Sequence, residues 1–156
     1  MYTDGGKRIH RFTSLMTNFP EYELAGIETI ARGICIQSGK VLLCRAKGGS
    51  STYLPGGHIE FGEKGCQALA REIREEMNVE ASVGEMVSVV ENQFVQHGKP
   101  HAEINLVYSM TLPEGTLAEA AENWIEFEWR KIDDLDAANL LPAEMAGLVR
   151  RSAGVR

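Results

Sequence analysis

The sequence predicts a single domain of the α/β class, in its α+β form, with helices packed around a mixed β-sheet. Several runs rich in Ile, Val and Leu have the length of strands, and two or three other segments have the apolar spacing of helices. The two kinds of segment do not alternate strictly, which disfavours a purely parallel sheet. The 156 residues are 44% hydrophobic, which is enough apolar material for one sizeable core.

The domain is predicted to span residues 27–156, after an N-terminal extension of residues 1–26. The extension is weakly patterned and lacks the apolar core of a signal peptide. It carries a small basic cluster, which we interpret as part of a solvated arm, with a contact to a substrate phosphate or to a second subunit as the alternative. The cluster consists of Lys7, Arg8, His10 and Arg11.

Two strands are predicted at residues 28–37 and 40–46, since both segments are rich in branched apolar residues. Residues 38–39 favour a tight turn, so the two strands are expected to form a hairpin. Gly56 and Gly57 follow after a loop. Adjacent glycines permit backbone dihedrals and close approaches that other residues cannot adopt, so the chain is expected to leave regular structure there.

Residues 65–77 are predicted to form an amphipathic helix, because apolar residues and glutamates fall on different arcs of the helical wheel. Asn78 stands where the helix should end, and asparagine tolerates the left-handed conformation that is common just past a helix. The residues of the apolar arc are Cys66, Leu69, Ala70, Ile73 and Met77.

Two longer strands are predicted at residues 83–96 and 102–112, joined by a turn at 97–100. The second of these strands has polar side chains at alternate positions, which places them on one face. A weaker polar stripe on the first strand contains Glu91 and Gln93. The polar set of the second strand is His101, Glu103 and Asn105.

The C-terminal part is predicted to contain a half-buried strand at residues 124–130, followed by a short helical segment at 133–136 and a longer one at 142–151. The strand alternates apolar and charged residues, which gives it one face toward the core and one toward solvent. The residues expected on the core face are Ile125, Phe127 and Trp129.

Charge and composition limit the classes of function. The formal net charge is -6 and the isoelectric point about 5.3, which disfavours long nucleic acid as a partner. No run of about 18 apolar residues is present, so no membrane span is expected. Three cysteines, at positions 35, 44 and 66, are too few and wrongly spaced for a zinc site. We interpret them as buried apolar residues, which suits a reducing cytoplasm.

The predicted helix contains an electrostatic conflict. Glu72 and Glu76 are like charges at i and i+4, Glu75 lies beside them, and the helix dipole disfavours anions at this end. A solvated acidic face is one interpretation, with Arg71 and Arg74 offsetting part of the repulsion. Bound Mg²⁺ is the other, because magnesium prefers oxygen ligands and would turn the repulsion into coordination.

The segment from residue 57 to residue 79, GHIEFGEKGCQALAREIREEMNV, resembles the signature of the Nudix hydrolases, the family of MutT-like proteins. The signature has a glycine, a distant glutamate, an Arg-Glu pair, a Glu-Glu pair and a final glycine. Asn78 stands at the position of that last glycine, and both residues suit a left-handed helix cap. The matching residues are Gly57, Glu63, Arg71, Glu72, Ile73, Glu75, Glu76 and Val79.

The resemblance implies both a fold and a division of labour. The implied fold is the Nudix sandwich with its loop-helix-loop, and the implied cofactor is Mg²⁺, with Mn²⁺ as a substitute. The glutamates of the helix would serve catalysis by holding the ions. The implied metal ligands are Gly56, through its carbonyl, Glu72, Glu75 and Glu76. The implied structural supports of the site are Gly57, Glu63 and Arg71.

The resemblance further implies that water attacks a phosphorus of a nucleoside diphosphate linked to another group. An NDP-sugar, ADP-ribose and a nucleoside triphosphate are all open as substrates, as is a dinucleoside polyphosphate. A helix glutamate or Glu103 would be the base, unless the face that carries Glu103 is merely exposed. A nucleotide sensor without activity is the alternative function, and a prenyl diphosphate isomerase is a weaker third. A homodimer is compatible with the sequence.

Overall fold

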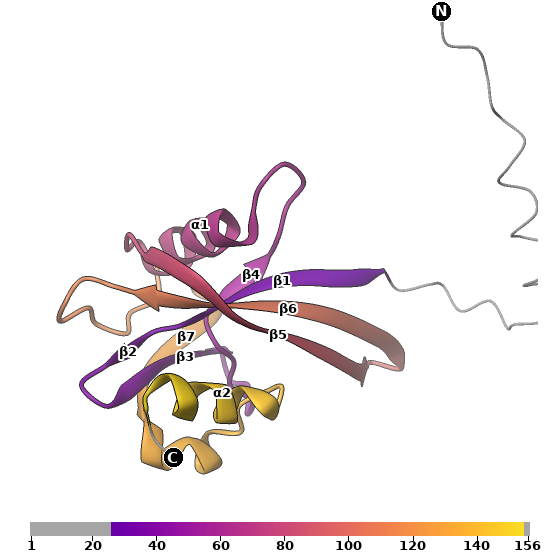
Figure 1. Ribbon diagram of the computed structural model, residues 1–156. Helices are drawn as coiled ribbons and strands as arrows, with labels where there is room; N and C mark the ends of the chain where they lie inside the picture. Colours follow the sequence, from indigo (N-terminus) through magenta and orange to yellow (C-terminus); the bar gives the residue numbers. More distant parts are fainter. Residues whose placement is uncertain (1–25, 155–156) are drawn as a thin grey trace, which may run out of the picture.

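The computed structural model describes residues 26–154, whose strands form two sheets with helices on opposite sides (Figure 1). The mixed α+β class that the sequence predicts is confirmed. The division of the strands into two sheets was not predicted. The four-stranded sheet has the order β4-β1-β6-β5 and consists of β1 (Ile27–Ile34), β4 (Gly56–His58), β5 (Ser82–Gln96) and β6 (Lys99–Thr111). The three-stranded sheet consists of β2 (Ile36–Gln37), β3 (Lys40–Ala46) and β7 (Ile125–Lys131).

The predicted hairpin at residues 28–46 is wrong for most of its length. The strand expected at 28–37 is divided at Cys35 into β1 and β2, and only the two residues of β2 pair with β3. β1 instead runs parallel to β6 and antiparallel to β4. An unbroken run of apolar residues shows that a segment is buried, but it does not show which partner the strand pairs with. The basic cluster of the N-terminal extension lies outside the described residues.

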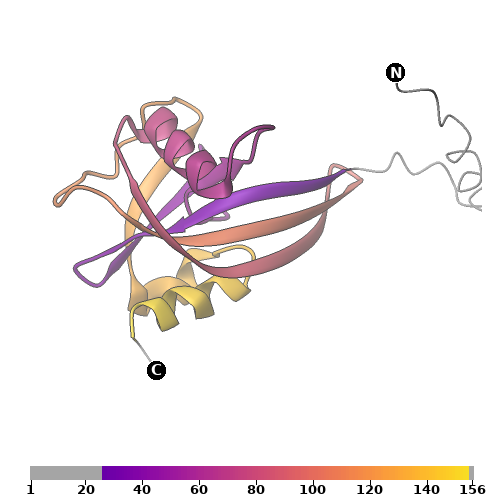
Figure 2. The same ribbon diagram turned by 45° about the horizontal axis from the view of Figure 1, so that its top comes forward.

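β3 shows how one strand serves two hydrophobic clusters. Val41 and Leu43 point into the cluster beneath α2 (Glu144–Ser152) and the 3₁₀ helix η2 (Ile132–Ala138), and the intervening Leu42 points into the cluster beneath α1 (Gly65–Met77). Because successive side chains alternate across a strand, a strand buried on both faces is a continuous apolar run. Figure 2 shows α1 and α2 on opposite sides of the strands.

The bounds of α1 are those predicted, and its caps follow from the residues present. At the start, the Gln67 side chain accepts the backbone N–H of Lys64 at 2.8 Å. At the end, Asn78 adopts the left-handed conformation with φ of 55°. Leu69 and Ile73 are fully buried, and each contributes roughly 1.5–3 kcal/mol to docking the helix on the sheet. Cys66, which was expected in the core, is only half-buried.

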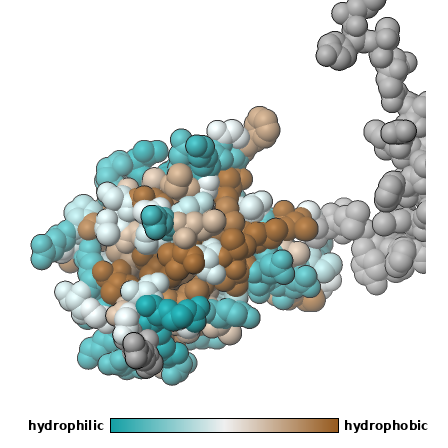
Figure 3. Space-filling model, viewed as in Figure 1, coloured by the Kyte–Doolittle hydropathy of each residue, from teal (hydrophilic) through white to brown (hydrophobic). Residues whose placement is uncertain are grey.

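β5 and β6 form a long hairpin whose turn is tighter than predicted. Both turn residues, His97 and Gly98, have positive φ, and Lys99 already belongs to β6. β5 is an edge strand with hydrophobic side chains in contact with solvent, among them Met86 and Val89. Figure 3 shows hydrophobic residues gathered across the middle of this face, where β5 runs.

The C-terminal elements follow the prediction closely. In β7, Ile125 and Phe127 are buried, and the half-buried Trp129 donates its indole N–H to the Thr116 carbonyl at 2.9 Å. The two predicted helical segments correspond to η2 and α2. None of the helices within residues 26–154 has the length and apolar character that crossing a bilayer requires.

Candidate active site

A cleft of about 550 Å³ lies where the two sheets and α1 meet. This volume is in the range of ligand sites, which is about 300–1,000 Å³. The acidic residues that line the cleft are Glu72, Glu76 and Glu103, and the basic ones are Arg32, Arg45 and His58. The aromatic and aliphatic residues of the lining include Tyr53, Phe94, Trp124, Ile125 and Leu141. Charged groups and apolar surfaces therefore share one cavity.

Glu76 is the most constrained acid of the cleft. Its side chain is 4% exposed, and its Oε2 atom is buried without a hydrogen-bond partner among the described residues. Burial, reinforced by the negative charge of Glu72 and opposed by Arg32, raises the pKa of Glu76 to about 7. A buried acceptor that lacks a partner is costly in free energy, so this oxygen has strong reason to take a cation or a proton.

Gly56 and Gly57 allow strand and helix to approach each other closely. Gly56 has φ of 134°, and a Cβ there would overlap the Ala31 carbonyl oxygen of the neighbouring strand. A Cβ on Gly57 would overlap the carboxylate of Glu72. Glycine is therefore required at Gly56, by its backbone conformation and by the neighbouring backbone, whereas at Gly57 a larger residue would displace the Glu72 carboxylate.

Arg71 organises the loop that precedes the helix. Its guanidinium forms two bonds to Glu63, of 2.7 and 3.2 Å, and a third bond of 3.0 Å to the His58 carbonyl. Its Nη1 donates to Glu72 at 2.9 Å and to Glu75 at 3.2 Å. The bonds to Arg71 lower the pKa of Glu63. Arg71 thus joins the loop before α1 to the helix, and the supporting role that the resemblance implies for Glu63 and Arg71 stays a prediction.

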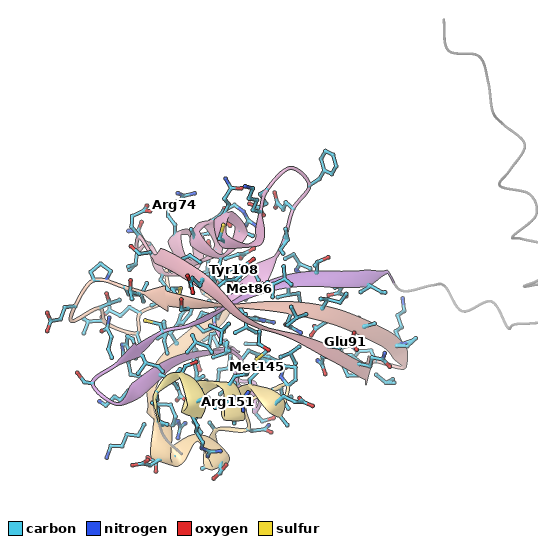
Figure 4. The ribbon with its side chains drawn as sticks, viewed as in Figure 1. Arg74, Met86, Glu91, Tyr108, Met145 and Arg151 are labelled. Atoms are coloured by element: carbon cyan, nitrogen blue, oxygen red, sulfur yellow. The ribbon has the colours of Figure 1, made fainter. Side chains whose placement is uncertain are left out.

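The other helix arginine takes no part in this network. Arg74 is exposed on the outer side of α1 (Figure 4). Glu75 has a side chain that is 55% exposed, and it does not belong to the cleft lining. Of the three glutamates that the sequence singled out, the structure therefore brings two, Glu72 and Glu76, to the cleft.

No group of three or more His, Cys, Asp or Glu side chains within residues 26–154 is arranged to hold a metal by itself. Glu72 and Glu75 are instead oriented by Arg71. The donor set nevertheless fits a hard divalent cation, because it combines the partnerless oxygen of Glu76, the carboxylate of Glu72 and the Gly56 carbonyl in one cleft. The Gly56 carbonyl also accepts a bond of 3.3 Å from Arg32, and its second lone pair is the one left for an ion. Magnesium sites in proteins usually complete their shell with water and substrate oxygens.

The polar face of β6 brings Glu103 into the cleft lining. Glu103 accepts N–H groups from Asn92 at 3.1 Å and from Asn105 at 3.4 Å, and Asn105 is fully buried. The interpretation of this face as merely exposed is therefore wrong. The stripe expected on β5 is also misplaced, because Glu91 lies outside the cleft lining whereas Asn92 belongs to it. Alternation along the strand places Glu91 and Asn92 on opposite faces, but it does not show which of the two faces meets the cleft.

Several residues of the cleft were not predicted to belong to it. Arg32 lies on β1 and Tyr53 in the loop before β4, and the Arg32 guanidinium carbon is 5.7 Å from the centre of the Tyr53 ring. Glu28 holds two histidines, with 2.9 Å to Nε2 of His58 and 3.3 Å to Nδ1 of His101. The sequence offers one signal for Arg32, since it is a charged residue in the middle of the apolar segment from Ile30 to Ile34.

Several solved structures share this fold. The E. coli ORF135 protein is 27% identical, with 83% of this chain and 94% of that chain covered and a TM-score of 0.56. A UDP-X diphosphatase is 24% identical over 94% of this chain and 72% of that chain, with a TM-score of 0.63. An ADP-ribose pyrophosphatase from Streptococcus suis is 18% identical over 82% and 92%, with a TM-score of 0.61.

Residues 28–151 match the family model described as "NUDIX domain". This match covers most of the chain, so the protein belongs to the Nudix family. The resemblance that the signature segment suggested is thereby confirmed. Nudix hydrolases generally use divalent metals.

Proposed function

We propose that this protein uses Mg²⁺ to hydrolyse a phosphoanhydride bond in a nucleoside diphosphate linked to another group. One observation carries the proposal. Glu76 is buried in the cleft with a partnerless oxygen, beside the like charge of Glu72. Two adjacent acids in a cleft of nucleotide size are stabilised when a cation and an anionic substrate occupy it together.

In this proposal Glu72, Glu76 and the Gly56 carbonyl hold Mg²⁺, with Mn²⁺ as an alternative ion. When bound, such an ion lowers the pKa of water and neutralises the phosphate oxygens. Arg71 bonds to Oε1 of Glu72, which leaves Oε2 for the ion. Glu75 becomes a further ligand only if its side chain turns toward the cleft, because it does not belong to the lining. Gly57, Glu63 and Arg71 keep the loop and the helix in register.

We assign the role of base to Glu103, with the helix glutamates as the alternative. Two amides, from Asn92 and Asn105, donate to its Oε2 atom and fix its orientation toward the cleft. A carboxylate in this position can accept the proton of an attacking water, and phosphoryl transfer otherwise requires positioning and charge neutralisation more than covalent steps.

The substrate is proposed from the class of the similar structures. The names UDP-X diphosphatase and ADP-ribose pyrophosphatase favour an NDP-sugar or ADP-ribose as first compounds to test, followed by nucleoside triphosphates. The apolar part of the cleft, with Trp124 and Leu141, suits the non-phosphate groups of such compounds. Free thiols at all three cysteines favour the cytoplasm, and a homodimer stays a prediction.

The test is a panel of NDP-sugars, ADP-ribose, nucleoside triphosphates and dinucleoside polyphosphates, assayed with Mg²⁺ and with Mn²⁺. Product identification by chromatography gives the bond that is cut. Glu76→Gln is expected to lower kcat by several orders of magnitude and to leave the circular dichroism spectrum unchanged. Turnover by this variant at the wild-type rate would refute the assignment of the metal site.

The role of Glu103 has its own prediction. Glu103→Gln keeps the shape and one acceptor oxygen but removes the basic carboxylate, so kcat is expected to fall roughly 10²- to 10⁴-fold with little change in KM. Steady-state kinetics on the best substrate of the panel measures both constants. An unchanged kcat would mean that Glu103 only supports the strand and that a helix glutamate is the base.

A further inference from the structure

The guanidinium of Arg32 is held rigidly at the floor of the cleft. Its Nη1 donates to the carbonyls of Leu54 at 3.1 Å and Gly56 at 3.3 Å, and its Nε donates to the amide oxygen of Asn105 at 3.4 Å. Asn105 is itself fully buried and donates to the Val90 carbonyl at 3.4 Å. The side chain therefore loses little further conformational freedom when it meets a ligand.

These contacts leave one end of the guanidinium unused. Arginine has five N–H donors, and Nε and Nη1 supply three of them to the bonds above. Nη2, with the other two, donates to no residue in the described part of the chain. It is also not among the buried partnerless atoms, so part of its surface is accessible, and the cavity that Arg32 lines is the cleft.

The charge of Arg32 is likewise not neutralised by direct contact. No ion pair within residues 26–154 includes Arg32. Arg45, the other arginine of the cleft, is paired with Glu126 at 2.8 Å and lies 3.9 Å from Glu128. Arg32 is therefore the cleft arginine that is free to bind an anion, and its field reaches Glu76.

We propose that Arg32 binds a non-bridging oxygen of the substrate's diphosphate through Nη2, and that Asn105 positions it. The proposal rests on the proposed function for the identity of the anion. A guanidinium donates to phosphate oxygens in charge-assisted bonds, which are stronger than neutral ones. In this arrangement Glu72 and Glu76 hold the metal cation, and Arg32 supplies a guanidinium in the same cleft. The diphosphate is then bound between these two positive charges.

Kinetics of Arg32→Ala and Arg32→Lys test the proposal. Arg32→Ala is expected to raise KM roughly ten- to a hundredfold, the range that loss of a charge-assisted bond gives. Lysine keeps the charge but cannot make all of the anchoring bonds, so the KM of Arg32→Lys is expected to lie between those of wild type and Arg32→Ala. Added guanidinium chloride should restore part of the affinity to Arg32→Ala and not to wild type. The matched control is Arg150→Ala, because Arg150 pairs with Asp136 away from the cleft.

A double-mutant cycle tests the positioning role of Asn105. If Asn105 acts through Arg32, Asn105→Ala raises KM in the wild-type background and adds little to Arg32→Ala. If the two residues instead act independently, through the stability of the fold, the effects of the two substitutions on KM add in the double variant. Thermal melting of each variant records that contribution separately.

Binding of ADP without metal separates this proposal from the proposed function. Calorimetry is expected to show that Arg32→Ala weakens ADP binding at least tenfold, whether or not any compound of the panel is hydrolysed. If no compound of the panel is hydrolysed, the hydrolase assignment is refuted. The affinity for ADP then still tests whether Arg32 binds the diphosphate. A KM and an ADP affinity within twofold of wild type in a folded Arg32→Ala protein would overturn the proposal, and Arg32 would then only join β1 to β4.

Discussion

The surroundings of one side chain, Glu76, account for the electrostatic conflict in the helix. The sequence placed the conflict among all three glutamates of α1. In the structure Arg71 bonds to Glu72 and Glu75, so their charges are partly compensated. Glu76 has no such partner and is buried, so the free-energy cost falls mainly on this residue. A carboxyl group with a pKa of about 7 can exchange its proton for a metal ion at neutral pH.

The raised pKa of Glu76 predicts how the stability of the metal-free protein depends on pH. The folded protein holds this proton more tightly than the unfolded chain, whose value is 4.5, so the free energy of unfolding falls as pH rises from about 4.5 to about 7. Glu76→Gln removes this dependence. Urea denaturation in EDTA measures the free energy of unfolding of both proteins. The value for Glu76→Gln minus that for wild type should rise by about 2 to 3 kcal/mol between pH 5 and pH 8.

The matched control for this measurement is Glu91→Gln. Glu91 is an exposed glutamate on β5, outside the cleft lining (Figure 4). Its substitution should leave the pH profile of stability parallel to that of wild type. Parallel profiles for Glu76→Gln as well would show that Glu76 titrates in the folded protein as it does in the unfolded chain.

Whether an element could be predicted from the sequence depended on how local its determinants are. The bounds of α1 follow from neighbouring residues, namely the Gln67 side chain at one end, Asn78 at the other and an apolar arc between them. The break at Cys35 does not, because up to Ile34 the chain pairs with β6, whose residues lie 75 positions further along. The Ser38 and Gly39 turn was predicted correctly but closes a hairpin of only two residue pairs.

The left-handed cap of α1 explains the departure of Asn78 from the family signature and gives a prediction. Asn78 has φ of 55°, which glycine adopts without strain and alanine does not. Asn78→Gly is expected to leave the free energy of unfolding within a few tenths of a kcal/mol, whereas Asn78→Ala should lower it by about 1 kcal/mol. Urea denaturation of both variants measures the difference. Equal stability of the two would mean that the cap conformation is not maintained in solution.

The whole molecule assembles the cleft from two sheets and a helix. Two of its glutamates, Glu72 and Glu76, come from a single continuous signature, so local spacing in the sequence was enough to predict them, whereas Glu103 comes from β6. Arg32, Tyr53 and Trp124 come from segments widely separated in the chain, and they meet only because β1 and β3 belong to different sheets that converge beneath α1. Non-local pairing of this kind leaves no periodic trace in the sequence.

Because the proposed ligands lie on both α1 and β4, an ion bound there should stabilise the whole fold. A ligand at ten times its dissociation constant adds about 1.4 kcal/mol to the free energy of unfolding, which raises the melting temperature of a domain this size by about 4 °C. The gain from Mg²⁺ should be several times larger at pH 8 than at pH 6, because at pH 6 the ion must displace the proton that Glu76 holds.

Calorimetric melting with MgCl₂, against NaCl of equal ionic strength, measures this shift. Glu76→Gln should abolish it, and Glu91→Gln should retain it in full. A shift of equal size at the two pH values would mean that Mg²⁺ binds without displacing a proton, at a place other than Glu76. A shift that persists in Glu76→Gln would mean the same. Both outcomes would separate the buried acid from the metal site, because only an ion that takes over the partnerless oxygen of Glu76 links metal binding, proton release and stability of the fold.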